Sequence, residues 1–175
     1  MAHKKSAGIL IYRRCEHGLR VFLVHPGGPF WARKDAGAWS IPKGEFQEDE
    51  TPLHAAKREF TEETGCTIDG DFLELPPVQQ PSGKTIYAFA IEGDCDPAAV
   101  KSNTFTLEWP KGSGRIREYP EVDRAAWFTI PQASRKMLKG QYPILLQLLH
   151  LLGEEPPQAI PTGDENDQDK PAPRH

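Results

Sequence analysis

The stretch from Thr51 to Gly65 constrains the fold of this 175-residue chain more than any other part. Thr51 is a good N-cap residue, Pro52 suits the first helical position, and Gly65 suits the left-handed conformation that ends a helix. The sequence therefore predicts a helix over Pro52–Thr64. One narrow apolar stripe on this helix is made of Leu53, Ala56 and Phe60.

Three glutamates, Glu59, Glu62 and Glu63, lie beside that stripe within an arc of roughly 100° on the helix. Like charges at these spacings repel by a few tenths of a kcal/mol per pair. An ordinary solvated helix face can carry this pattern, with Arg58 reaching Glu62 to neutralise part of the charge. A hard divalent cation with oxygen ligands would also offset the repulsion. The surrounding residues decide between these two interpretations.

Seven residues in and before the helix have a recognisable spacing. They are Gly44, Glu50, Arg58, Glu59, Glu62, Glu63 and Gly65. This pattern over residues 44–66 resembles the Nudix box, the signature of the MutT-like Nudix hydrolases, and every fixed identity of the box is present. The last position is Cys66 where an aliphatic residue is usual, and cysteine behaves as a small hydrophobe when buried.

The rest of the chain predicts an α/β fold. Alternating and apolar runs predict strands over residues 6–12, 20–25, 39–41, 72–75, 85–91, 102–109 and 125–128. Two further helices are expected, one from about residue 131 to residue 140 and one over residues 143–152. Strands on both sides of one central helix, followed by a closing helix, fit an α/β/α sandwich with a mixed sheet. The resemblance implies the same Nudix-type fold.

Residues 1–152 are expected to form the Nudix hydrolase domain, and residues 153–175 a disordered, acidic, proline-rich tail. The tail holds five prolines, six acidic residues and two basic ones, so its formal charge equals the net charge of −4 of the whole chain. Residues 1–152 are therefore formally neutral. A neutral domain without a basic stripe makes nucleic acid an unlikely partner.

The cysteines and the apolar runs predict a cytoplasmic protein with no membrane segment. Cys15, Cys66 and Cys95 are far apart in the sequence and form no CxxC pair, which indicates reduced thiols with a packing role. The apolar run at residues 7–12 is too short for a signal or membrane segment. The apolar face of residues 143–152 is expected to pack in the core, and the chain to be a monomer or a homodimer.

The resemblance implies hydrolysis of a phosphoanhydride bond in a nucleoside diphosphate linked to another group. Mg²⁺ is the expected cofactor, with Mn²⁺ as a substitute. Glu62 and Glu63 are the expected main ligands, and the carbonyl of Gly44 is a further candidate. Glu59 is either a third ligand or the general base, and the sequence leaves both roles open. We expect Arg58 to be catalytic by orienting these carboxylates; Glu50 and Gly65 would give structural support.

A late acidic residue is a second candidate base. Many members of the family have an acidic residue in a loop shortly before a late tryptophan. Here the loop is expected at residues 115–127, and Glu121 lies six residues before Trp127. Glu121 is therefore a candidate metal ligand or alternative catalytic base, and Glu118 is the second choice.

The substrate is less constrained by the sequence. In the loop at residues 25–35, Phe30 and Trp31 either stack on a base or cap the core, while Arg33 and Lys34 can meet phosphates. The Pro-Lys-Gly that contains Lys43 resembles that of dinucleoside polyphosphate hydrolases and diphosphoinositol hydrolases. A phosphorylated inositol substrate is expected to need a more basic pocket than this formally neutral domain offers. A nucleotide, as a dinucleoside polyphosphate or a (deoxy)nucleoside triphosphate, is therefore the expected substrate.

Two alternative functions belong to other classes. One is a catalytically silent nucleotide-sensing Nudix module, but such a module is expected to lose box glutamates, and none is lost here. The other is an RNA 5′-end pyrophosphohydrolase, against which the absence of a basic stripe argues.

Overall fold

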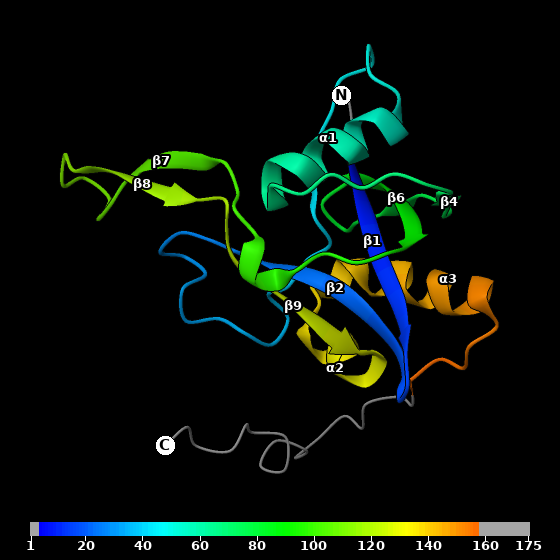
Figure 1. The fold of residues 1–175 in the computed structure, drawn as a ribbon. Coiled ribbons are helices and arrows are strands. Elements are labelled where there is room, and N and C mark those ends of the chain that lie inside the picture. Colours follow the sequence, from blue (N-terminus) through cyan, green and yellow to red (C-terminus); the bar gives the residue numbers. More distant parts are fainter. Residues whose placement is uncertain (1–3, 158–175) are drawn as a thin grey trace, which may run out of the picture.

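A computed structural model describes residues 4–157 of the chain. A mixed central sheet separates helix α1 (Pro52–Thr64) from helices α2 (Ile130–Lys136) and α3 (Tyr142–Leu152), which lie on its opposite face (Figure 1). This is the predicted α/β/α sandwich, so the fold class is confirmed. None of the helices within residues 4–157 is long and apolar enough to cross a membrane. Most of the predicted tail lies outside the described residues.

The central sheet contains both parallel and antiparallel pairs. Its strands are β1 (Lys5–Cys15), β2 (Gly18–Pro26), β3 (Lys43–Glu45), β4 (Leu73–Glu74), β5 (Val78–Gln79), β6 (Thr85–Glu92) and β9 (Val122–Thr129). The order is β4-β6-β1-β2-β9, with β3 paired to β1 and β5 paired to β6. The β1–β6 pair is parallel, and the other pairs are antiparallel. A separate hairpin of β7 (Thr104–Glu108) and β8 (Ile116–Pro120) projects from the body of the molecule (Figure 1).

The central strand β1 is buried on both faces, which explains its continuous apolar run. Ala7, Ile9 and Ile11 pack on the α1 side, whereas Leu10 and Tyr12 pack on the α3 side. Successive side chains of a strand point to opposite faces of the sheet, so this one strand supplies both halves of the core. The sheet is thus a rigid base under α1.

Helix α1 has the predicted bounds. The Thr51 hydroxyl accepts a hydrogen bond from the His54 backbone N–H at 3.2 Å. Gly65 adopts the left-handed conformation at φ 74° and donates its N–H to the Thr61 carbonyl at 2.8 Å. The helix packs on the sheet through buried Ala55, Ala56 and Phe60. The remaining side of the helix is free to present its carboxylates.

The predicted strand at residues 39–41 is wrong. This segment makes only isolated bridges, between Ser40 and Val24 and between Trp39 and Met137. The N–H of Ile41 is bonded to the side-chain oxygen of Gln141 at 3.0 Å and not to a neighbouring strand. Regular pairing begins just after this segment, at β3.

The late loop expected at residues 115–127 is also wrong, because most of it is β8 and β9. The strand predicted over residues 102–109 is the shorter β7, and β8 pairs with it. Phe105 and Tyr119 are directly opposed in this hairpin, with ring centroids 5.9 Å apart. Such cross-strand aromatic pairs stabilise a hairpin that has little core of its own.

The two late helices are present with adjusted bounds. The first ends at Lys136 and not at residue 140, and a 3₁₀ turn (Lys139–Gln141) follows it. The second is α3, and its apolar face packs in the core, as expected, through Ile144, Leu145, Leu148 and Leu149.

Candidate active site

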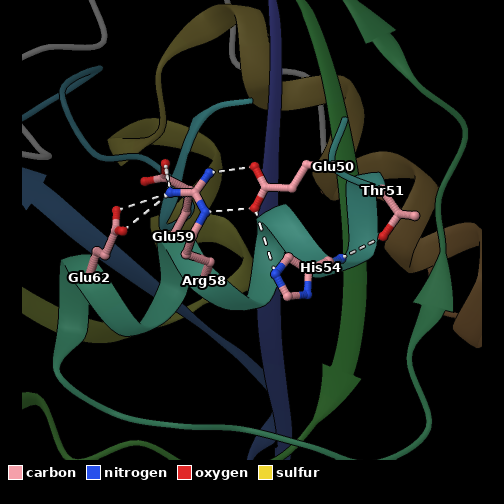
Figure 2. Close-up of polar contacts among 6 residues, drawn as sticks. All are labelled: Glu50, Thr51, His54, Arg58, Glu59 and Glu62. Carbon is pink, nitrogen blue, oxygen red and sulfur yellow. Dashed lines mark hydrogen bonds and ion pairs between the residues drawn. The ribbon is translucent and has the colours of Figure 1, made fainter. Parts of the chain in front are cut away.

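The Arg58 guanidinium lies among the carboxylates of Glu50, Glu59 and Glu62 (Figure 2). Its Nε and Nη2 donate to the two oxygens of Glu50 at 2.7 and 2.9 Å. Its Nη1 donates to Glu59 Oε1 at 2.8 Å and to Glu62 Oε1 at 3.2 Å. These bonds lower the pKa of the Glu50 carboxyl and raise the pKa of Arg58 above its ordinary value. Arg58 is therefore a fixed cation that joins the loop before α1 to two of its glutamates.

Glu59 packs directly against the backbone of Gly44. A Cβ added at Gly44 would lie 2.0 Å from Glu59 Oε2, so no other residue fits there without moving the carboxylate. Gly44 lies in β3 opposite Ala7. Burial raises the pKa of Glu59, as does the nearby charge of Glu62, while the bond from Arg58 lowers it.

Glu63 points away from Arg58 and meets Lys43 instead. Its Oε1 accepts a hydrogen bond from the Lys43 backbone N–H at 3.2 Å. Burial raises the pKa of Glu63 to about 8, and the bond from Lys43 and the charge of Lys43 only partly oppose this. Burial likewise lowers the pKa of the Lys43 ammonium, and the nearby Lys84 adds to this effect. Burial thus disfavours the charged form of both groups, and the charge that each offers the other compensates only in part.

Glu121 lies at the bend between β8 and β9, close to the end of α1. Its N–H donates to the Asn103 carbonyl at 2.8 Å, and its carbonyl accepts from Gly27 N–H at 3.0 Å. Asn103 in turn donates its N–H to the Glu62 carbonyl at 2.8 Å. Burial, followed by the charge of Glu62, raises the pKa of Glu121. The second-choice residue, Glu118, is exposed on β8.

A pocket of about 190 Å³ opens beside these carboxylates. Lys43, Glu63 and Glu121 line it together with Trp31. Apolar side chains, among them Val24 and Leu138, line it as well. The pocket therefore combines an acidic edge, one half-buried cation and an aromatic ring, which is a suitable lining for a nucleotide with phosphates.

The loop at residues 25–35 contributes unequally to this pocket. Trp31 packs against the core and also lines the pocket. Its stacking on a base stays a prediction. Lys34 Nζ lies 5.0 Å from the centroid of the Trp31 ring. Phe30 is 60% exposed and pairs edge-to-face with Trp109 at 5.1 Å, so it does not cap the core. Arg33 is exposed and is not among the lining residues.

A buried histidine holds this loop, and sequence reasoning missed it. His25 is fully buried, with Nδ1 2.8 Å from Asp123 Oδ1 and Nε2 2.6 Å from the Lys34 carbonyl oxygen. Its ring also packs edge-to-face on Trp39 at 5.2 Å. The only sequence signal is a histidine at the end of an apolar strand, which does not reveal that its partners lie 98 and 9 residues away.

The donor set suits a hard divalent cation, because Glu59, Glu62 and Glu63 supply carboxylate oxygens and no soft ligand. Within residues 4–157, however, no three His, Cys, Asp or Glu side chains are already arranged around one ion position. The carboxylates of Glu59 and Glu62 accept hydrogen bonds from Arg58, and the carboxylate of Glu63 accepts one from the Lys43 backbone N–H. The residues thus fit the ion chemically, and binding requires these side chains to turn.

Comparison with known proteins identifies the family of the chain. The family model described as NUDIX domain matches residues 2–149. The chain belongs to the NUDIX domain family. The expectation of a pyrophosphohydrolase is confirmed at the level of this family, whose members generally use divalent metal ions. A curated MutT-like protein of Streptomyces ambofaciens is 28% identical over 136 residues, or 75% of this chain and 77% of that protein.

Solved structures show the same fold at low identity. The NUDIX domain of Shewanella oneidensis NrtR, in complex with ADP ribose, has a TM-score of 0.61 at 16% identity, covering 87% of this chain and 90% of that one. An Ap4A hydrolase of C. elegans, in a binary complex, has a TM-score of 0.57 at 18% identity, covering 86% of this chain and 98% of that one. At such identities the likeness establishes the fold.

The buried carboxyl of Glu63 predicts a pH-dependent stability in the metal-free protein. Its pKa of about 8 in the folded chain exceeds the ordinary 4.5, so the folded state binds the proton more tightly. The resulting stabilisation is fully present below about pH 4.5 and is lost as the pH rises through about 8. We expect the free energy of unfolding, measured by urea titration with a chelator, to fall over this window.

Glu63→Gln is the matched control for this prediction, because the amide keeps the shape of the side chain and cannot ionise. Its free energy of unfolding should change less with pH than that of the original chain. Equal pH dependence in both proteins would show that Glu63 is not the titrating group.

Proposed function

We propose that this chain is a Mg²⁺-dependent hydrolase that cleaves a phosphoanhydride bond in a dinucleoside polyphosphate or a nucleoside triphosphate. The observation that supports this most directly is the position of Glu63 and Glu121 in one pocket with Lys43 and Trp31. This pocket thereby contains two carboxylates that can bind the cation, the Lys43 ammonium that can bind a phosphate, and the Trp31 ring that can stack on a base. The domain is proposed to span residues 1–152.

Glu62 and Glu63 are the proposed main ligands of the cation, with Glu59, the Gly44 carbonyl and Glu121 as further oxygens. When bound, the cation neutralises phosphate charge and acidifies the attacking water. Mn²⁺ offers the same preference for oxygen ligands and is a suitable substitute.

Two carboxylates can accept the proton of the attacking water. Burial raises the pKa of Glu59 and of Glu121, and a carboxylate with a raised pKa is the stronger base near neutral pH. Arg58 positions Glu59 through its 2.8 Å bond, whereas Glu121 is positioned only through its backbone. Glu59 is therefore the first candidate and Glu121 the second.

Basic and aromatic residues in the pocket and on the loop beside it are proposed to contact the substrate. Lys43 faces the carboxylate edge and is placed to neutralise a phosphate, and Trp31 offers a ring face for a base. Lys34 lies over the Trp31 ring, and Arg33 is exposed on the same loop, so both can contact the outer phosphates of a longer substrate. A nucleotide substrate also agrees with the fold likeness to an Ap4A hydrolase and to a domain complexed with ADP ribose. A cytoplasmic location remains a prediction.

Removal of either main ligand predicts a loss of metal-dependent turnover. Glu62→Gln and Glu63→Gln each remove one charged oxygen ligand and keep the side-chain volume. Both variants should lose at least about 10²-fold in kcat with diadenosine tetraphosphate and Mg²⁺ while keeping the circular dichroism of the original chain. Glu118→Gln, an exposed acidic position outside the pocket, is the control. Near-full activity in both ligand variants would rule out this metal assignment.

The identity of the base predicts a difference between two further variants. If Glu59 takes the proton, Glu59→Gln should lower kcat by about 10²–10⁴-fold, and Glu121→Gln should lower it much less. The measurement is the pH dependence of kcat for both variants at saturating Mg²⁺. A large loss confined to Glu121→Gln would instead place the base at the bend between β8 and β9.

A further inference from the structure

Two of the cysteines, distant in sequence, meet at the end of the catalytic helix. Cys66 Sγ and Cys95 Sγ are 3.0 Å apart, and both are free thiols in this structure. Cys66 directly follows the C-cap of α1, and Cys95 lies between β6 and the 3₁₀ turn at Pro97–Ala99. We propose that Cys66 and Cys95 form a site of reversible disulfide formation when the protein meets hydrogen peroxide.

Hydrogen bonds anchor the backbone of each cysteine. Cys66 donates its N–H to the Thr64 hydroxyl at 3.1 Å. Cys95 donates its N–H to Asp94 Oδ1 at 2.9 Å, and its carbonyl accepts from Trp127 Nε1 at 3.0 Å. A disulfide bond is about 2.05 Å long, so the sulfur atoms must approach by only about 1 Å. We assign this small movement to rotation of the two side chains.

The two cysteines differ in their access to solvent, which assigns their roles. Cys95 is only 5% exposed, whereas Cys66 is partly exposed. Burial, together with the contact to Cys66, raises the pKa of the Cys95 thiol to about 12. Cys66 is therefore the thiol that meets peroxide first, and Cys95 is the resolving thiol.

The chemistry balances with peroxide as the only oxidant. The Cys66 thiol releases its proton to solvent, and the thiolate attacks one peroxide oxygen. The O–O bond breaks, Cys66 becomes a sulfenic acid, and the departing hydroxide takes up a proton from solvent and leaves as water. Cys95 then attacks the Cys66 sulfur, its thiol proton goes to the departing hydroxyl, and a second water leaves. Two thiols and one peroxide thus give one disulfide and two waters. A small thiol reverses the reaction by exchange.

The disulfide would join the end of α1 to the segment between β6 and β7. Lys101 N–H already donates to the Thr64 carbonyl at 2.9 Å beside this pair. Because the required movement is small, the carboxylates of α1 stay in place, and turnover should change by less than about twofold. The cross-link restricts the unfolded chain, so the melting temperature should rise by about 5 °C or more.

The test uses the full chain treated with one to a few equivalents of hydrogen peroxide. The intact mass should fall by about 2 Da, and a non-reducing digest should contain a peptide that joins Cys66 to Cys95. Dithiothreitol should restore the mass and the original melting temperature.

Cys15→Ser is the matched control, because Cys15 lies at the end of β1 and the variant keeps the pair intact. It should lose the same mass and gain the same thermal stability, whereas Cys66→Ser and Cys95→Ser should do neither. A bond that involves Cys15, a bond between two chains, or oxidation of Cys66 without a link to Cys95 would overturn the proposal. So would an unchanged mass in the original chain.

Discussion

The arrangement of the glutamate side chains on α1 depends on the guanidinium of Arg58. Glu59 and Glu62 are three residues apart on one helix face, and their charges would repel each other without a partner. Arg58 donates hydrogen bonds to both carboxylates and two further hydrogen bonds to Glu50. Planar, two-pronged pairing of this kind fixes direction as well as distance. Arg58 thereby fixes α1 relative to the loop before it, and the absence of a side chain at Gly44 leaves room for the Glu59 carboxylate beside β3.

A second group of charges lies beyond the reach of Arg58. Glu63 and Glu121 line the pocket with their pKa values raised by burial, and Lys43 has its pKa lowered for the same reason. Leaving such charges poorly solvated costs stability, which is common where a site is organised for a ligand. The proposed divalent cation and the phosphates of the proposed substrate would supply opposite charges to these groups. The carboxylates thus form two sets. Glu50, Glu59 and Glu62 are hydrogen-bonded to Arg58, whereas Glu63 and Glu121 line the pocket.

Local features of the site could be predicted from the sequence, and features made by distant contacts could not. The bounds of α1 were predicted correctly because its cap residues and spacing are contained in one short stretch. The strand at residues 39–41 was wrong because a bond from Ile41 to Gln141, 100 residues later, replaces strand pairing. The hairpin strand β8 was missed because its residues are largely exposed. The contact of Cys66 with Cys95 likewise has no signal in their spacing.

We propose that Glu62 and Glu63, with Glu59 beside them, hold a divalent cation at the edge of the pocket. A crystal structure with Mn²⁺ and a non-hydrolysable dinucleoside polyphosphate would locate this cation, because manganese is identified by its anomalous scattering. We expect an anomalous peak bounded by Glu62 and Glu63, with phosphate oxygens next to it and next to Lys43. The absence of a peak there, or a peak only at exposed acidic residues away from α1, would rule out this cation site.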